Sequence, residues 1–99
     1  MVRAPIDTDE RTRYLDVFNA LADPIRLEIV SRCAATEECA CTLLEEVLPV
    51  AKSTISYHIK ILYRAGLLEV RKEGRFYHYR LKRDVMEAFL PGFVDRLAK

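Results

Sequence analysis

The side chains with the clearest capacity for chemistry lie in one stretch, KSTISYHIKILYRAG, which runs from Lys52 to Gly66. Its polar positions carry hydroxyl groups, cations and an imidazole, and the stretch contains no acidic residue. Groups of these kinds donate hydrogen bonds to phosphate oxygens and reach base edges in the major groove of DNA. The residues of this stretch that we predict to contact DNA are Lys52, Ser53, Thr54, Ser56, Tyr57, His58 and Lys60. For His58 an alternative role is packing against the segment that follows.

An apolar stripe on the same stretch predicts a helix over about residues 52–65. Four apolar residues recur at helical spacing, namely Ile55, Ile59, Leu62 and Ala65. Gly66 then ends the helix, because glycine readily adopts the left-handed backbone conformation. The helix therefore has one face for the core and one polar face, and we interpret it as the recognition helix of a helix-turn-helix.

A basic β-hairpin is predicted directly after this helix. Residues 67–72 and 75–81 have the composition of short strands, and Glu73-Gly74 separates them as a turn. Three cations at this turn are predicted to contact phosphates: Arg71, Lys72 and Arg75. A recognition helix followed by such a hairpin is the layout of a winged helix-turn-helix. In that fold the helix enters the major groove, and the hairpin, or wing, reaches the DNA backbone or the minor groove.

The positive charge of the chain is concentrated in the segment that contains the predicted recognition helix and hairpin. The 99 residues carry a net charge of +1. Residues 1–51 hold five Lys or Arg and ten Asp or Glu, residues 52–83 hold nine and two, and residues 84–99 hold two and three. A basic segment within an otherwise acidic chain is typical of nucleic-acid binding, and the overall charge conceals it. We therefore predict double-stranded DNA as the partner.

Three further helices are predicted before the recognition helix. Asp7 is expected to cap a helix over residues 8–22, and Asp23-Pro24 begins a second helix that ends near residue 35. The second helix is expected to turn Ile25, Ile29, Val30 and Cys33 inward. A short third helix starts at Thr42, which forms a capping box with Glu45. Its buried side is predicted to consist of Leu43, Leu44, Val47 and Leu48.

The first and last helices are unusually apolar for a chain of this length. The last helix is predicted over residues 84–97, with a kink or a division into two short helices at Pro91-Gly92. The first helix carries Tyr14, Leu15, Val17, Phe18 and Leu21. Since such helices usually cover other helices, we predict that both pair across the two-fold axis of a homodimer. The expected fold of residues 1–99 is one mainly α-helical domain, with the order helix, helix, helix, helix, strand, strand, helix.

The length, the hydropathy and the cysteine content of the chain limit the classes of protein to which it can belong. One domain of 99 residues buries only a modest core, so that a dimer interface would add stability. The chain has no long uncharged apolar run and no features of a secretory signal, which argues against a membrane protein. Three cysteines, an odd number, argue against a disulfide framework and favour the reducing cytoplasm.

Taken in order, these motifs resemble the ArsR/SmtB (arsenic-repressor-like) family of winged helix-turn-helix regulators. The matching segments are ALADPIRLEIV at 20–30, EECAC at 37–41, STISYHIKIL at 53–62, AGLLEVRKEGR at 65–75 and YHYRL at 77–81. The resemblance implies a homodimeric transcriptional repressor that leaves its operator when an inducer binds. Two positions depart from the family pattern. Ala51 stands where a capping serine usually precedes the recognition helix, and Thr42 stands where an aspartate commonly follows Cys-x-Cys.

The resemblance also implies a role for two of the cysteines. In relatives that sense trivalent arsenic or antimony, a Cys-x-Cys at the start of the third helix binds the ion, and Cys39 and Cys41 match these positions. Soft thiolates suit a soft metalloid, and a helix N-terminus favours the thiolate. Residues i and i+2 lie about 200° apart on a helix, so ligation by both sulfurs should unwind its first turn. The candidate third ligand is Cys33. No resident cofactor is expected.

Other roles for the cysteines stay open. Cysteine often behaves as a small buried hydrophobic residue, and Cys33 lies on the inward stripe of the second helix. A thiol redox switch is a further alternative, in which Cys33 pairs with Cys39 or Cys41, or a bond forms between subunits. Zinc sensing is a weaker expectation. Related zinc sensors use Asp and His on the last helix, and residues 84–99 contain no histidine.

Two other function classes fit the sequence less well. A thiol enzyme would need a histidine and an orienting third group at a recognisable spacing, and the chain has neither this arrangement nor a glycine-rich loop. A winged helix that binds only proteins is opposed by the acid-free helix and the basic hairpin. We therefore predict a DNA-binding repressor and not an enzyme.

Overall fold

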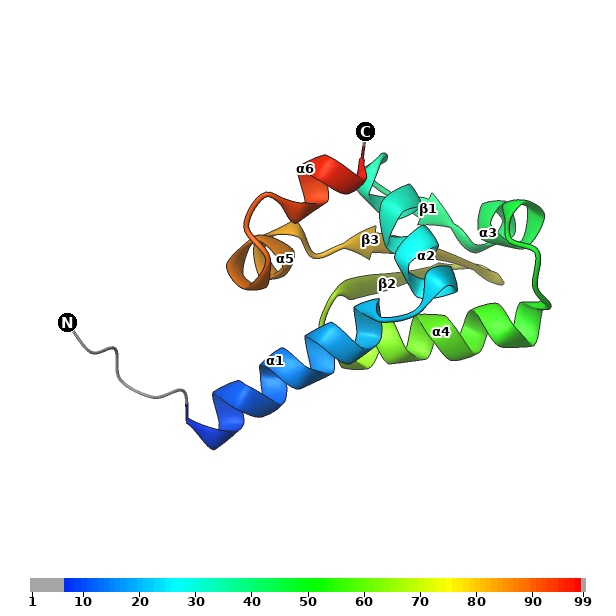
Figure 1. The fold of residues 1–99 in the computed structure, drawn as a ribbon. Coiled ribbons are helices and arrows are strands. Elements are labelled where there is room, and N and C mark those ends of the chain that lie inside the picture. The colour runs from blue at the N-terminus through cyan, green and yellow to red at the C-terminus, as the bar shows by residue number, and fades with distance from the viewer. Residues whose placement is uncertain (1–6, 99) are drawn as a thin grey trace.

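The computed structural model describes residues 7–98, in which six helices surround a three-stranded sheet (Figure 1). The helices are α1 (Thr8–Leu21), α2 (Pro24–Ala34), α3 (Cys41–Val47), α4 (Lys52–Arg64), α5 (Arg83–Phe89) and α6 (Phe93–Leu97). The strands are β1 (Cys39–Ala40), β2 (Leu68–Glu73) and β3 (Phe76–Leu81). The mainly helical fold with a β-hairpin wing is thus confirmed. None of these helices meets the length and apolarity that a membrane span requires.

Of the three helix caps predicted from the sequence, two are present in the structure. The carboxylate of Asp7 accepts a hydrogen bond from the backbone N–H of Glu10 at 2.7 Å, and that of Asp23 accepts from the N–H groups of Ile25 and Arg26. By contrast, the expected capping box of Thr42 is wrong. Ala40 is the N-cap of α3, because pairing of β1 keeps the chain extended up to that residue. The predicted C-terminal helix is divided, and α5 and α6 are separated at Pro91-Gly92.

The sheet is antiparallel with the strand order β1-β3-β2. Strand β1 was not predicted, since its two residues pair only with a segment almost forty positions away, Cys39 with Tyr79 and Ala40 with His78. The wing turn consists of Gly74 and Arg75, and not of Glu73-Gly74 as predicted. Glycine occupies the first central position with φ +63°, as a two-residue hairpin of the II′ type requires.

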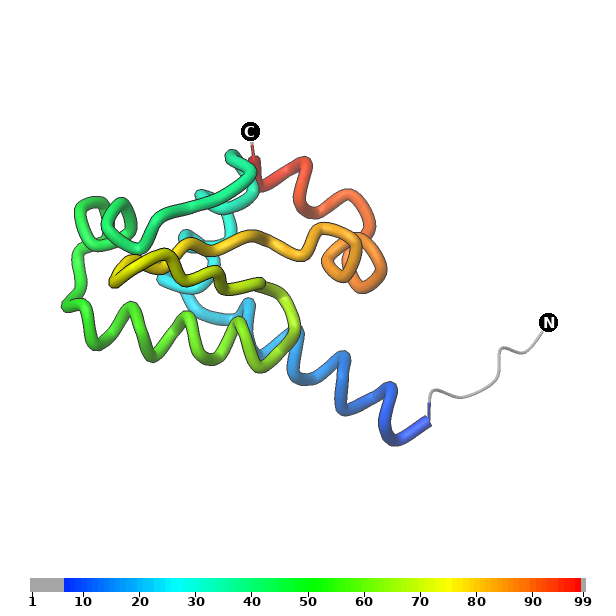
Figure 2. The backbone as a smooth tube through the Cα atoms, turned by 180° about the vertical axis from the view of Figure 1, so that it is seen from behind, coloured from blue at the N-terminus to red at the C-terminus, as the bar shows by residue number. Residues whose placement is uncertain are grey.

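The core lies between the sheet, α2 and the apolar face of α4 (Figures 1 and 2). The predicted stripe on α4 is buried along its whole length, and so are Ile29, Val30 and Cys33 of α2, whereas Ile25 is half-buried. Helix α3 buries only Leu44 and Leu48. The prediction for Leu43 and Val47 is wrong, because a helix of seven residues packs one face on β3 and leaves the other to solvent.

Helix α1 leaves most of its apolar surface uncovered in the single chain. It extends away from the other elements and contacts α2 and α4 near its C-terminal end (Figure 2). Only Val17 and Ala20 of α1 are buried, while Leu15 and Phe18 are 60% and 47% exposed. The ring of Tyr14 meets that of Phe89 edge-on with centroids 4.9 Å apart, so that the apolar surface of α1 continues onto α5.

Candidate nucleic-acid interface

The solvent side of α4 carries most of the residues that were predicted to contact DNA. Lys52, Ser53, Ser56, Tyr57 and Lys60 are exposed, and Thr54 is half-buried. We call this set, together with the exposed Tyr63 and Arg64, the polar face of α4. Tyr63 and Arg64 were not predicted from the sequence, although they follow Lys60 by three and four residues, a spacing that places them on the same helix face. Within the described residues 7–98, the one acidic contact of this face is a long ion pair of 3.8 Å from Lys52 to Glu45 of α3, which screening by water makes weak.

His58 does not belong to the polar face, and the prediction that it is positioned to contact DNA is wrong. Its side chain is only 7% exposed, and it packs toward the start of α2 and not toward the wing. The reason is helical geometry. Position 58 follows Ile55 by three residues and precedes Leu62 by four, which places it on the buried stripe.

The partner of His58 is a buried arginine that the sequence interpretation did not single out. Arg26 is 8% exposed, and its Nη1 lies 3.0 Å from Nδ1 of His58. Its Nε donates to the carbonyl oxygen of Ala20 at 2.7 Å, and its Nη2 donates to that of Asn19 at 3.1 Å. These carbonyls belong to the last turn of α1, where that of Asn19 also accepts from the N–H of Ala22 at 3.2 Å. In the sequence, position 26 precedes Ile29 by three residues, and this spacing indicates that Arg26 lies on the buried face of the second helix.

The chemistry of this contact assigns the tautomer of the His58 ring. Arginine offers only donors, so Nδ1 of His58 must accept, and the neutral ring carries its proton on Nε2. That nitrogen lies 3.9 Å from the carboxylate of Asp23. The backbone N–H of Arg26 holds the pKa of Asp23 below its usual value. The cap of α2, the end of α1 and the middle of α4 thus share one network of polar contacts.

The three cations of the wing occupy different environments. Arg75 lies in the exposed turn, and Lys72 is exposed with its Nζ 5.8 Å from the ring centre of Tyr77. Arg71 does not lie at the tip as predicted, because it sits within β2 opposite His78. Its guanidinium binds both carboxylate oxygens of Glu38, at 2.9 and 2.7 Å, and one of Glu73 at 2.8 Å. Arg71 keeps the pKa of both glutamates below the usual value.

The cysteines are free thiols, and the structure separates the predicted pair. Cys39 lies in β1 and is buried beside Cys33 of α2, whereas Cys41 is the first residue of α3 and is half-buried. The thiol of Cys33 donates to Cys39, which lowers the pKa of Cys39 and raises that of Cys33. The expectation that both predicted sulfurs lie on the first turn of the third helix is therefore wrong for Cys39, because the pairing of β1 with β3 holds it in an extended strand.

The fit of the thiols to a bound ion is partial. Within residues 7–98 no three His, Cys, Asp or Glu side chains are grouped closely enough to hold a metal ion. Cys33 and Cys39 fit ligation by two thiolates. A third sulfur would come from Cys41 only if the start of α3 changed its conformation.

The sequence is similar to those of known transcriptional regulators. The profile of a family described as a helix-turn-helix domain matches residues 21–71. An uncharacterised HTH-type transcriptional regulator of Bacillus subtilis is 35% identical over 91 residues, which cover 91% of this chain and 90% of the relative. The arsenical resistance operon repressor of the same organism is 37% identical over 79 residues, which cover 79% of this chain and 74% of the repressor.

Solved structures of transcriptional regulators have a fold similar to that of this chain. One is the homodimeric winged helix-turn-helix DNA-binding domain of a Mycobacterium bovis protein, a possible ArsR-family transcriptional regulator. It has a TM-score of 0.75 and 27% identity, and the match covers 88% of this chain and 81% of that domain. An ArsR-like transcriptional regulator from Rhodococcus sp. RHA1 has a TM-score of 0.67 and 28% identity, with 92% of both chains covered.

The role of Arg26 as the link between three helices can be tested by Arg26→Met. This change leaves the carbonyl of Ala20 and the Nδ1 of His58 without a donor, while the carbonyl of Asn19 keeps the N–H of Ala22. We expect the free energy of unfolding to fall by about 2–4 kcal/mol. Urea unfolding followed by circular dichroism measures the loss. Arg32→Met is the matched control, because Arg32 is half-buried and its one ion pair within residues 7–98 is with Glu28 on the same helix. Equal stability of the two variants would contradict the assigned role.

Proposed function

The chain belongs to the ArsR family of winged helix-turn-helix transcriptional regulators, and from this premise we propose that it is a homodimeric repressor of double-stranded operator DNA. The polar face of α4 and the β2–β3 wing form the proposed contact surface. One observation carries the proposal above all others. The polar face of α4 holds hydroxyls and cations without an acid, and the strands of the basic wing lie next to it.

The dimensions and the N-terminus of α4 suit insertion into the major groove. Its 13 residues span about 20 Å, and the helix is narrow enough for the groove width of about 12 Å. Ala51 precedes it and gives no side-chain cap. The first backbone N–H groups of α4 are therefore available to a DNA phosphate, which the helix dipole also favours. In this proposal, Ala51 in place of a capping serine leaves a backbone N–H of the first turn of α4 free to donate to DNA.

The wing contacts are assigned to Lys72 and Arg75, whose charges are not neutralised by an ion pair within residues 7–98. Arg71 is already bound to Glu38 and Glu73. It would reach a phosphate only by exchanging one of these carboxylates for it. We therefore assign to Arg71 the orientation of the wing.

The apolar surface of α1 supports the homodimer. Leu15 and Phe18 are exposed to an extent that is unusual for large apolar side chains, and the contact of Tyr14 with Phe89 extends this surface to α5. A two-fold interface through α1 and the C-terminal helices would cover it. It would also present two copies of α4, as recognition of two half-sites requires.

Release by a thiol-directed inducer is the second part of the proposal. Cys39 is the thiol that ionises more readily, because Cys33 donates a hydrogen bond to it. Trivalent arsenic or antimony would bind these sulfurs, with Cys41 as a further ligand after a change at the start of α3. The alternative is an oxidative switch that joins Cys33 and Cys39, in the same repressor without metal sensing.

Electrostatic contact by the wing predicts a specific effect of Arg75→Ala. Loss of one phosphate contact should weaken binding about equally on operator and unrelated DNA, and lower the slope of log K against log salt by about one. Fluorescence anisotropy with DNA from the chain's own upstream region, at several salt concentrations, measures both effects. Arg96→Ala is the control, since Arg96 lies on α6, away from the wing. An unchanged slope for Arg75→Ala would refute the wing contact.

The proposed interface predicts that Phe18→Lys produces a monomer. The charge would lie on the apolar surface of α1, where burial without a partner is unfavourable, while the exposed position spares the fold of the single chain. Light scattering after gel filtration measures the molar mass, and circular dichroism checks the fold. Val47→Lys on α3 serves as control, because Val47 is similarly exposed outside this surface. A folded dimer of Phe18→Lys would place the interface elsewhere.

Thiol sensing predicts that trivalent arsenic weakens the DNA complex of the reduced protein. The response should disappear in Cys39→Ser, because this change removes the thiol that ionises more readily. Cys41→Ser tests whether the third sulfur is required. Release by an oxidant alone, with a Cys33–Cys39 disulfide found by mass spectrometry, would select the redox alternative. A complex that ignores arsenic, antimony and oxidants would assign the thiols to the core.

A further inference from the structure

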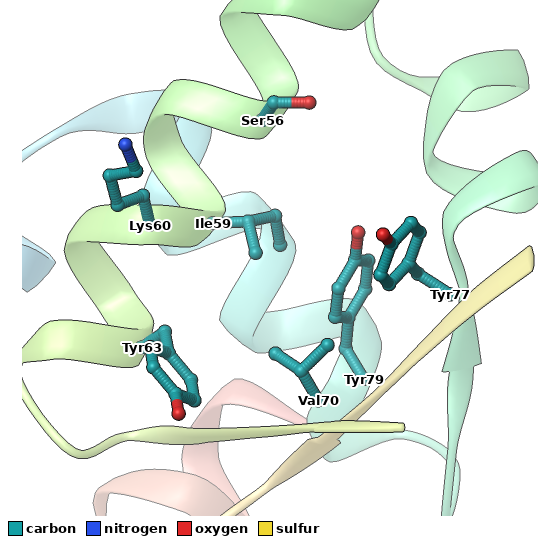
Figure 3. Close-up of a pocket in the computed structure, with 7 residues that line it drawn as sticks. All are labelled: Ser56, Ile59, Lys60, Tyr63, Val70, Tyr77 and Tyr79. Carbon is teal, nitrogen blue, oxygen red and sulfur yellow. The ribbon is translucent and has the colours of Figure 1, made fainter. Parts of the chain in front are cut away.

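A groove between α4 and the wing is not used by the proposed inducer chemistry. It has a volume of about 630 Å³. Figure 3 shows its walls, with Lys60 and Tyr63 on α4 and with Tyr77 and Tyr79 on the sheet. Such a volume lies within the range of small-molecule sites, which is about 300–1,000 Å³. No carboxylate is among the residues that line it.

The most informative side chain of the groove is Tyr79. The residue is 7% exposed, yet its hydroxyl has no hydrogen-bond partner within residues 7–98. No side-chain oxygen of this part of the chain is fully buried without a partner, so the hydroxyl retains access to the groove. Figure 3 shows it turned into the space between α4 and the sheet, beside the hydroxyl of Tyr77. A ligand would supply the contact that the fold does not.

The hydroxyl of Tyr79 is available as a donor at any physiological pH. Burial raises its pKa to about 12, and the neighbouring Cys41 and Glu45 act in the same direction. A phenol that stays protonated donates to an acceptor atom such as a carboxylate oxygen.

The other walls define the chemical class of the ligand. The rings of Tyr63 and Tyr77 are exposed, and Ile59 with Val70 supplies aliphatic surface between them. Aromatic rings and aliphatic groups of this kind favour a flat aromatic ligand, with offset or edge contacts. Lys60 adds the one cation among the lining residues. The surrounding segment, residues 52–83, holds nine Lys or Arg against two Asp or Glu and therefore favours an anion.

From these features we infer that the groove binds a planar aromatic anion, such as an aromatic carboxylate, and that this binding competes with DNA. Tyr79 donates to the anionic group, and Tyr63 and Tyr77 contact the ring. Figure 3 shows the ammonium group of Lys60 turned away from Tyr79, so Lys60 pairs with the anion after its flexible side chain has turned inward. Competition follows from position, because Ser56 and Lys60 belong both to the groove and to the polar face of α4. Binding of the ligand stands independently of the proposed function, whereas the competition rests on it.

The experiment uses 2-naphthoate, a fluorescent aromatic carboxylate, as the probe of the full chain without DNA. We expect saturable binding of one probe per subunit. Tyr79→Phe should weaken it roughly threefold to tenfold, as the loss of one hydrogen bond does, and Lys60→Met should weaken it about tenfold. Tyr14→Phe is the matched control for the first variant, because Tyr14 lies on α1 outside the groove. The neutral 2-naphthalenemethanol should bind about tenfold more weakly than the carboxylate.

A steric variant and a DNA arm complete the test. Val70→Trp should fill the groove and abolish probe binding, and since Val70 is exposed, circular dichroism should show an intact fold. In the DNA arm, 2-naphthoate should displace DNA from the wild type but not from Val70→Trp. Absence of saturable binding, or binding that Tyr79→Phe and Val70→Trp leave unchanged, would overturn the inference and leave the groove to the DNA backbone.

The two failures can be told apart. A protein that binds 2-naphthoate in the groove but binds no DNA would refute the proposed function alone. A probe that binds in the groove without displacing DNA would refute the competition.

Discussion

The arrangement of the helices depends on the buried guanidinium of Arg26. It satisfies two carbonyls at the end of α1 and the Nδ1 of His58 in the middle of α4, while its own helix is capped by Asp23. A buried cation is unfavourable unless its donors are used, so this set of partners makes one relative placement of the three helices favourable. The contact of Arg26 with His58 on the buried face of α4 therefore determines the direction in which the polar face of the helix points. In the proposed dimer, the same contact would relate the direction of α4 to the interface on α1.

A second set of contacts connects the thiols to the wing. Glu38 immediately precedes Cys39 and holds Arg71 of β2 with both carboxylate oxygens, and β1 pairs with β3. Helix α3 begins two residues after Cys39 and leads through a short turn into α4. In the proposed mechanism, a displacement of Cys39 would reach the wing through Glu38 and α4 through α3. This arrangement gives the proposed thiol chemistry a physical route to DNA release that does not require unwinding of α3.

The sequence was sufficient for the features that depend on local periodicity. The stripe of α4, the caps at Asp7 and Asp23 and the hairpin after Gly66 follow from spacing within a few residues. What it could not indicate are contacts between distant segments. Strand β1, the placement of Cys39 in a strand rather than on α3, and the ion pair of Arg71 with Glu38 all depend on pairing with residues more than thirty positions away. His58 and Arg26 are intermediate cases. Their spacing indicated burial, but their polarity favoured an interpretation as surface residues.

The distribution of satisfied polar groups links the fold to the proposed binding surfaces. Arg26, Asp23 and Arg71 could each bind an external ligand, yet each is occupied by partners within the chain. Three groups that lack such partners in the described residues are the first N–H groups of α4, the tip of the wing and the hydroxyl of Tyr79. These three lie on or beside one face. Polar groups without a partner in the fold lower its stability. Such unpartnered donors are expected at a surface that binds an anion, because the anion then supplies the missing contact. For that reason the same side of the molecule supports both the DNA proposal and the groove, and the two ligands would compete for it.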